Sequence, residues 1–239
     1  MTMGVPSTAD PHTGTHPIPA ADPGPPPEQV RAFYDAVARE YADSFADELD
    51  GKPMDRALLE RFAADVRGAG PVYDLGCGPG GQTTAFLLAR GVDVRGMDLS
   101  SEAVAEAARR HPHIRFETGD MLALPLEDGA TAGIVAFYAI VHFAPDQLRT
   151  AMGEMARVLR PGAPLLVAFH VGDEVVHVDE MFGRQASVNF RFHPVERVKA
   201  AMRDARLGEV EAIVREPYPE VEHPTRRAYV FARTPIGSG

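Results

Sequence analysis

An acid and a cluster of glycines lie close together in residues 72–81, VYDLGCGPGG. This run is typical of a short apolar strand that ends in an acid and turns into a helix. A chain that reverses in this way beside a ligand needs positive φ angles and no Cβ atoms in the way, which Gly76, Gly78 and Gly80 or Gly81 allow. The run therefore predicts a binding site of the nucleotide type.

The spacing of these glycines fits two classes of ligand. Gly76, Gly78 and Gly81 match the dinucleotide fingerprint, and an acid, Asp98, follows about 20 residues later. The carboxylate of Asp74 separates the two classes, because it sits badly beside a pyrophosphate and well beside a cation. It favours a ligand that carries an ammonium or sulfonium group, whereas the glycines alone leave an NAD(P)-dependent oxidoreductase open.

The same run resembles the first motif of the class I S-adenosylmethionine-dependent methyltransferases, of the type that acts on small molecules. The resemblance extends over residues 30–233. It implies S-adenosylmethionine as cofactor, S-adenosylhomocysteine as product, and one Rossmann-like α/β domain whose seven-stranded sheet has an antiparallel last strand. The alternation of strands and helices predicts by itself a doubly wound parallel sheet with helices on both faces.

Residues that hold the cofactor follow from strand ends and from the resemblance. Asp98 ends a strand and is expected to accept the ribose hydroxyls, because ligands of open α/β sheets bind at the carboxyl ends of strands. By resemblance, Asp120 accepts from the adenine amino group, and an amino-terminal helix folds a tyrosine over the cofactor; an aromatic stripe that packs on the core is the alternative there. The expected cofactor-binding residues are Tyr34, Tyr41, Asp74, Gly76, Gly78, Gly80, Asp98, Leu99, Asp120, Met121, Phe137 and Tyr138.

Three histidines are candidates for catalysis. Methyl transfer from a sulfonium is an in-line displacement, so the enzyme mainly aligns the reacting atoms and excludes water, and a hydroxyl acceptor is helped by a base. His142, His170 and His177 each fall on or after the carboxyl end of a predicted strand. His142 is the first choice, and a structural histidine bonded to backbone is the alternative at each position.

The sequence divides into three parts. Residues 1–27 are rich in proline and predict a disordered leader, residues 28–68 a helical cap, and residues 69–239 the binding domain. Within that domain, residues 170–193 show the least regular pattern and are expected to form a lid or substrate pocket. Helices are predicted from 28 and over 54–66, 82–90, 100–110, 145–159 and 194–205, and strands over 72–74, 92–97, 114–117, 132–137, 164–169, 210–215 and 227–232.

Composition excludes several classes of protein. The formal charge of −10 and the scarcity of lysine, with only Lys52 and Lys199, argue against binding to a phosphate backbone. The single cysteine, Cys77, allows no intramolecular disulfide, and no apolar run approaches the roughly 18 residues needed to span a bilayer. A cytoplasmic protein with a small-molecule substrate is predicted, with no nucleic acid and no membrane as partner.

Several alternatives stay open. An oxidoreductase would need a Tyr-x-x-x-Lys pair, but Tyr138 is followed four residues later by His142. A non-catalytic module that binds S-adenosylmethionine, a homodimer, and an oxygen, nitrogen or carbon acceptor are all compatible with the sequence. An apolar or aromatic acceptor is expected from Met181, Phe182, Phe190 and Phe192. No metal is predicted, because the spacing of His170, Asp173, Glu174 and His177 decides nothing about a metal site.

Overall fold

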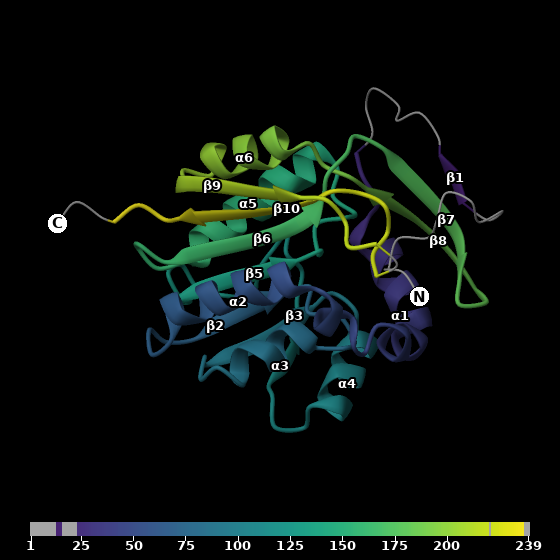
Figure 1. Cartoon of the computed structure of the whole chain (residues 1–239), viewed down its shortest axis with the longest axis horizontal. Helices are drawn as coiled ribbons and strands as arrows, with labels where there is room; N and C mark the ends of the chain where they lie inside the picture. The colour runs from purple at the N-terminus through teal and green to yellow at the C-terminus, as the bar shows by residue number, and fades with distance from the viewer. Residues whose placement is uncertain (1–12, 16–22, 220, 237–239) are drawn as a thin grey trace.

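A twisted sheet of seven strands in the order β4-β3-β2-β5-β6-β10-β9 forms the centre of the computed structural model (Figure 1). The structure describes residues 13–15, 23–219 and 221–236. Among these strands β10 alone runs in the direction opposite to the other six, which confirms the predicted fold class. The strands are β2 (Val72–Leu75), β3 (Val94–Asp98), β4 (Phe116–Thr118), β5 (Gly133–Phe137), β6 (Pro164–His170), β9 (Gly208–Arg215) and β10 (Arg227–Arg233).

Helices cover both faces of this sheet because its central strands are apolar on both sides. Ile134 and Val135, neighbours in β5, belong to separate buried clusters, one packed on α5 and α6 and the other on α2. Such continuous apolar runs are typical of parallel strands that are buried on both faces. The helices are α1 (Pro27–Ser44), α2 (Pro53–Val66), α3 (Gln82–Leu88), α4 (Ser101–Arg110), α5 (Pro145–Val158) and α6 (Val195–Asp204), with a short 3-10 helix, η1 (Glu48–Gly51).

A β-hairpin occupies most of the segment that was expected to be irregular, so that expectation was wrong. Strands β7 (Val175–Met181) and β8 (Arg184–Arg191) pair antiparallel around a two-residue turn in which Phe182 and Gly183 have positive φ angles. Val176 and Val178 are buried, whereas His177 between them is partly exposed and Asp179 after them is exposed. This alternation with a period of two is the signal of a half-buried strand.

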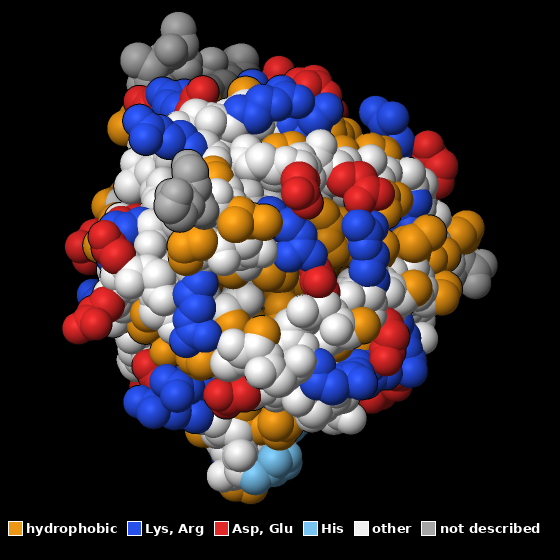
Figure 2. All heavy atoms as spheres, turned by 90° about the vertical axis from the view of Figure 1, so that its left-hand side faces the viewer, with side chains coloured by type: hydrophobic (Ala, Val, Ile, Leu, Met, Phe, Trp, Pro, Cys, Tyr) orange, Lys and Arg blue, Asp and Glu red, His pale blue; other side chains and the backbone are white. Residues whose placement is uncertain are grey.

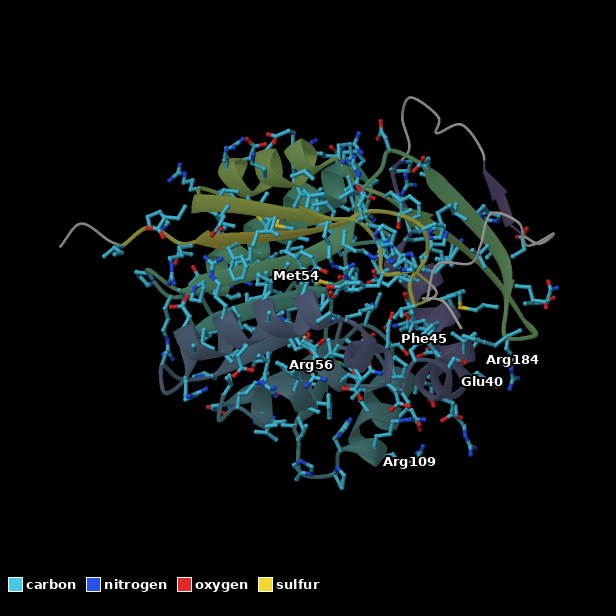
Figure 3. All side chains as sticks on the ribbon, in the orientation of Figure 1. Glu40, Phe45, Met54, Arg56, Arg109 and Arg184 are labelled. Atoms are coloured by element: carbon cyan, nitrogen blue, oxygen red, sulfur yellow. The ribbon has the colours of Figure 1, made fainter. Side chains whose placement is uncertain are left out.

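The hairpin and α1 together cover the carboxyl ends of the parallel strands (Figure 1). Phe33 and Val37 of α1 share a third buried cluster with Val188 and Phe190 of β8. At the surface, Arg184 donates a hydrogen bond of 2.8 Å to Glu40 and ties the hairpin to the helix (Figure 3). A cap over the binding edge of the sheet therefore consists of α1 and the hairpin.

The predicted leader is described only in part. Residues 1–12 and 16–22 lie outside the described residues. Thr13–Thr15 form strand β1, which pairs with β7, so the expectation of disorder does not hold there. The carbonyl of Pro25 accepts a hydrogen bond of 2.9 Å from Gln147, which holds the chain just before α1 against α5.

The end of the molecule opposite the cap has a mixed surface. Figure 2 shows acidic, basic and hydrophobic side chains interspersed over this face. Binding to a phosphate backbone uses a continuous basic surface instead. Within the described ranges, no helix combines the length and the apolar character needed to cross a membrane.

A buried carboxylate joins α2 to the far strands of the sheet. Asp55 has no exposed surface and accepts hydrogen bonds from the hydroxyls of Tyr138 and Tyr229, at 2.7 and 2.5 Å, and from Arg215 at 2.7 Å. Arg215 also donates to both oxygens of Glu222, at 2.5 and 2.7 Å. This network holds Tyr138, which follows β5 with a positive φ of 55°, at the edge of the sheet where ligands bind.

Replacement of Asp55 by alanine is expected to lower the free energy of unfolding by about 3–5 kcal/mol, because it removes one of the two carboxylates that neutralise Arg215 and leaves the hydroxyls of Tyr138 and Tyr229 without this acceptor. Asp65→Ala on the same helix is the control. Its ion pair with Arg233 is partly exposed, and exposed pairs contribute about 0–1 kcal/mol. Urea unfolding followed by circular dichroism measures both. Equal losses in the two variants would contradict the assigned role of Asp55.

Candidate active site

A pocket lies over the carboxyl ends of β2, β3 and β5, beneath α1. Its wall includes every residue that the sequence predicts to hold the cofactor, together with His142. Parallel strands present their carboxyl ends at one edge, and the chain brings its acids and glycines there from three different loops. The predicted residues in the wall are Tyr34, Tyr41, Asp74, Gly76, Gly78, Gly80, Asp98, Leu99, Asp120, Met121, Phe137 and Tyr138.

The glycine turn leaves room for a ligand at its backbone. Gly76 has a φ of +69°, and a Cβ atom there would lie 2.4 Å from the Cβ of Ala139. Gly78 has a φ of +63°, and a Cβ atom there would meet nothing within 4 Å. Only glycine adopts these angles without strain. The turn is closed by packing at Gly76 and open toward the pocket at Gly78.

Asp74 is a buried carboxylate at the end of β2. It is 1% exposed and accepts a hydrogen bond of 2.6 Å from the hydroxyl of Thr84 in α3. Burial raises the pKa of Asp74 to about 7; the hydrogen bond from Thr84 opposes this shift, and the charge of Asp98 adds to it. A ligand cation beside Asp74 would stabilise the ionised form, so the site is suited to an ammonium or sulfonium group.

The other two acids are oriented by backbone N–H groups. Asp98 accepts from Ser100 and from Gly78, each at 2.9 Å, and burial raises its pKa. Asp120 accepts a bond of 2.8 Å from the N–H of Leu122, so it forms a turn and also lines the pocket. Each carboxylate retains further lone pairs for the hydroxyl or amino groups of a ligand.

His142 has a defined tautomer. Its Nδ1 lies 2.8 Å from the carbonyl oxygen of Asn189, which can only accept, so Nδ1 carries the proton. Nε2 therefore accepts a hydrogen bond of 3.0 Å from the hydroxyl of Tyr34. Burial lowers the pKa of His142 to about 4, opposed by the bond to Asn189 and assisted by the charge of Arg191. At neutral pH the ring is neutral, with its lone pair directed at Tyr34.

The cap contributes neutral phenols to the pocket. Burial raises the pKa of Tyr34 and that of Tyr41, with charged or ionisable neighbours adding to the shift. The two rings meet edge to face, with centroids 5.9 Å apart. Tyr34 and Tyr41 therefore remain neutral phenols that line the pocket, and their contact with a cofactor stays a prediction.

The other two histidines lie outside the pocket wall, which corrects their placement as candidate bases. His170 is buried behind Tyr138, with ring centroids 5.4 Å apart, and its Nδ1 lies 2.8 Å from the hydroxyl of Thr225. His177 is on the hairpin, bonded to Asn189 at 2.7 Å and to Asp179 at 2.9 Å. Both histidines were expected near the carboxyl ends of strands. Tyr138 separates His170 from the pocket, and His177 lies within the hairpin, away from the pocket.

The pocket wall also contains residues that the sequence did not predict as part of the site. Lys52 is 2% exposed and lines the pocket beside Glu48 and Asp55. The only local signal at Lys52 is the proline that follows it at the start of α2, and this does not reveal where the side chain points. Among the described residues, no three side chains of His, Cys, Asp or Glu gather in a group that could hold a metal ion.

Comparison with known proteins agrees with this geometry. Residues 72–162 match the family described as a methyltransferase domain. The chain is 37% identical over 145 residues to a demethylmenaquinone methyltransferase of Beutenbergia cavernae, which covers 59% of this chain and 58% of that protein. The chain thus spans less than two thirds of the length of this relative.

Two solved structures share the fold. One is a Burkholderia thailandensis 1,6-didemethyltoxoflavin-N1-methyltransferase with its substrate and S-adenosylhomocysteine bound, with a TM-score of 0.68, 19% identity, and coverage of 95% of this chain and 97% of that one. The other is the [4+2]-cyclase SpnF, with a TM-score of 0.67, 21% identity, and coverage of 91% of this chain and 100% of that one.

The sheet order, the glycine turn and the three acids define a Rossmann-like domain of the class I methyltransferase type. Residues 72–162 match the methyltransferase domain family, and the chain is similar in sequence to methyltransferases and in fold to S-adenosylmethionine-dependent ones. This confirms the family that the sequence resembles.

Asp74 makes ligand binding depend on pH. Because its pKa is raised to about 7, the carboxylate is protonated at lower pH and loses its attraction for an ammonium group. The affinity for S-adenosylhomocysteine is expected to rise between about pH 5.5 and 8, by up to about tenfold per unit below the pKa. Calorimetric titration of the wild type and of Asp74→Asn measures this. A dependence of equal steepness in Asp74→Asn would assign it to another group.

Proposed function

We propose that this protein transfers a methyl group from S-adenosylmethionine to an oxygen, nitrogen or carbon atom of a small organic acceptor. The observation that carries the proposal is the convergence of Asp74, Asp98 and Asp120 with His142 in one capped pocket. The acids suit the cationic and hydroxyl groups of the cofactor, and the histidine suits a proton of the acceptor. The names of the relatives support the same reaction class.

The residues of the pocket have separate tasks in this reaction. S-adenosylmethionine, when bound, supplies a methyl group on a positively charged sulfur. Asp74, Asp98 and the backbone at Gly78 hold the cofactor, while α1 excludes water, so that the acceptor is aligned for in-line attack. For a hydroxyl acceptor, Nε2 of His142 exchanges the hydroxyl of Tyr34 for that of the acceptor and takes its proton as the new bond forms. A weak base is sufficient, because the attacking oxygen becomes strongly acidic during transfer.

The acceptor is proposed to be apolar or aromatic. Val30, Phe45, Met121 and Phe143 line the pocket beside the polar groups. The apolar residues 181, 182, 190 and 192, from which the sequence predicts such an acceptor, are absent from the pocket wall. Phe190, for example, is 2% exposed within the core beneath the hairpin. Met181, Phe190 and Phe192 pack within the cap, whereas Phe182 is exposed at the turn of the hairpin. The acceptor surface comes from α1 and from the loops after the strands.

Other functions on the same fold remain to be tested against this one. A [4+2]-cyclase shares the architecture, and fold alone does not determine the reaction. A module that binds S-adenosylmethionine without turnover, and an NAD(P)-dependent oxidoreductase, are the alternatives from the sequence. Cytoplasmic localisation and a homodimer stay predictions.

Asp98→Ala tests the identity of the cofactor. Wild-type protein is expected to bind S-adenosylhomocysteine but not NAD or NADP in calorimetric titrations. Loss of the carboxylate removes hydrogen bonds to the ribose, each contributing about 1.5–3 kcal/mol when charged, so Asp98→Ala is expected to bind at least tenfold more weakly. Asp93→Ala, an exposed acid just before the same strand, is the control. Binding of NAD in place of S-adenosylhomocysteine would identify an oxidoreductase.

His142→Ala tests the proposed base. The variant is expected to bind S-adenosylhomocysteine as the wild type does, and to transfer labelled methyl groups to the acceptor about 10²- to 10⁴-fold more slowly. His113→Ala, at an exposed position, is the control, and thermal unfolding of each variant checks its folding. Since the pKa of His142 is about 4, wild-type turnover at saturating S-adenosylmethionine, where the pH dependence of cofactor binding through Asp74 no longer limits the rate, is expected to fall only below about pH 5. Undiminished turnover in His142→Ala would remove the residue from the mechanism.

A further inference from the structure

Charged side chains continue the wall of the pocket behind Tyr138. They come from the start of α2 and the residue before it, from β9, from the segment between β9 and β10, and from the start of β10, and each side chain is at most 9% exposed. Burial of so many charges is costly unless they are paired, and it is frequently associated with a function. The group consists of Lys52, Asp55, Arg215, Glu222 and Arg227.

Lys52 is the member of this group that brings a positive charge to the pocket surface. Its ammonium lies 2.7 Å from Glu48, 3.7 Å from Glu222 and 4.7 Å from the centre of the Tyr138 ring. The closest partner, Glu48, also lines the pocket, and its side chain is 22% exposed. A ligand anion can therefore replace Glu48 at Lys52 while Glu48 turns to solvent.

The buried charges are unequal in sign. Three of the five are cations, and Arg215 takes both carboxylates, Asp55 and Glu222, in hydrogen bonds of 2.5 to 2.7 Å. Arg227 approaches Glu222 only to 3.7 Å, and its Nε and Nη2 have no hydrogen-bond partner within the described part of the chain. Glu48 balances this excess while it is paired with Lys52, so a positive potential arises at the pocket wall when Glu48 turns to solvent.

The positive charges of this group also affect the pKa of a neighbouring histidine, His170. Burial lowers the pKa of His170 well below its usual value, and the charges of Arg227 and Lys52 lower it further. The ring of His170 lies against Tyr138, whose ring also lies under the ammonium of Lys52. A neutral histidine at this position adds no charge that would compete with an anion for Lys52.

Opposite charges thus lie on neighbouring parts of one pocket. Tyr138, under the ammonium of Lys52, directly follows β5, and β5 pairs with β2, which carries Asp74. Asp74 suits an ammonium or sulfonium group, whereas Lys52 suits a carboxylate. The pocket is complementary to a ligand that carries both charges, or to two ligands that carry one each.

We propose that Lys52 is an anion-binding residue that receives a carboxylate of a small-molecule ligand, with Arg227 and Arg215 supporting its charge. The carboxylate has two sources: the amino-acid tail of S-adenosylmethionine, or an acidic acceptor. The inference rests on the proposed function, because it assumes that the pocket binds this cofactor. It adds a specific residue, from outside the glycine turn and the three acids, to the determinants of binding.

Calorimetry with two nucleosides separates these sources. S-adenosylhomocysteine carries the amino-acid tail, and 5′-methylthioadenosine has the same thioether nucleoside without it. Both are titrated into the wild type, Lys52→Met and Lys52→Arg, and benzoate is titrated into each protein saturated with S-adenosylhomocysteine. Lys199→Met is the matched control, because Lys199 is the only other lysine and pairs with Glu196 on the exposed side of α6.

If the carboxylate belongs to the cofactor, Lys52→Met weakens the binding of S-adenosylhomocysteine about 10- to 100-fold, as loss of a charged hydrogen bond predicts. The affinity for 5′-methylthioadenosine then stays unchanged. If it belongs to the acceptor, both nucleosides bind normally and benzoate binding is lost. Lys52→Arg retains binding in either case, which distinguishes lost charge from damaged folding.

Unchanged binding of all three probes in Lys52→Met would overturn the inference. Equal weakening of both nucleosides would also overturn it, since it would show a structural role. Failure of the wild type to bind either nucleoside would instead overturn the proposed function. Lys199→Met is expected to match the wild type throughout.

Discussion

The need to compensate buried carboxylates at one edge of the sheet governs the rest of this structure. Asp74 requires the hydroxyl of Thr84, Asp98 requires the N–H groups of Gly78 and Ser100, and each donor belongs to a different turn or helix. A buried charge without such donors destabilises the fold by several kcal/mol. The donors therefore determine how α3 and α4 begin, and the beginnings of these helices shape the pocket.

The cap extends the same network above the pocket. His142 joins three elements, because its loop follows β5, its Nδ1 bonds to β8 and its Nε2 bonds to α1. One side chain thus links the sheet, the hairpin and the helical cap. The imidazole is therefore neutral and oriented before any ligand arrives, and the proposed role as a base would require only that the acceptor displace Tyr34 from Nε2.

Electrostatics distinguishes two parts of the pocket. The acids at the end of β2 and of β3 line one part of the pocket, and Lys52 lines a neighbouring part, with Arg215 and Arg227 buried behind it. The fold is shared with enzymes of different names, so the backbone does not select the reaction. Selection depends on the side chains that the loops add at this edge.

The sequence by itself determined the parts of the protein whose signals are local. Asp74, Asp98 and Asp120 each follow a short apolar strand, and parallel strands align their carboxyl ends, so their convergence was predictable. Only the tertiary structure decided which histidine reaches the pocket and that Lys52 enters its wall. The polar residues of the hairpin concealed its alternation, and the partners of Lys52 and His142 lie far away in the chain. Contacts between distant residues depend on how the elements pack, and this is not encoded in the spacing of neighbouring residues.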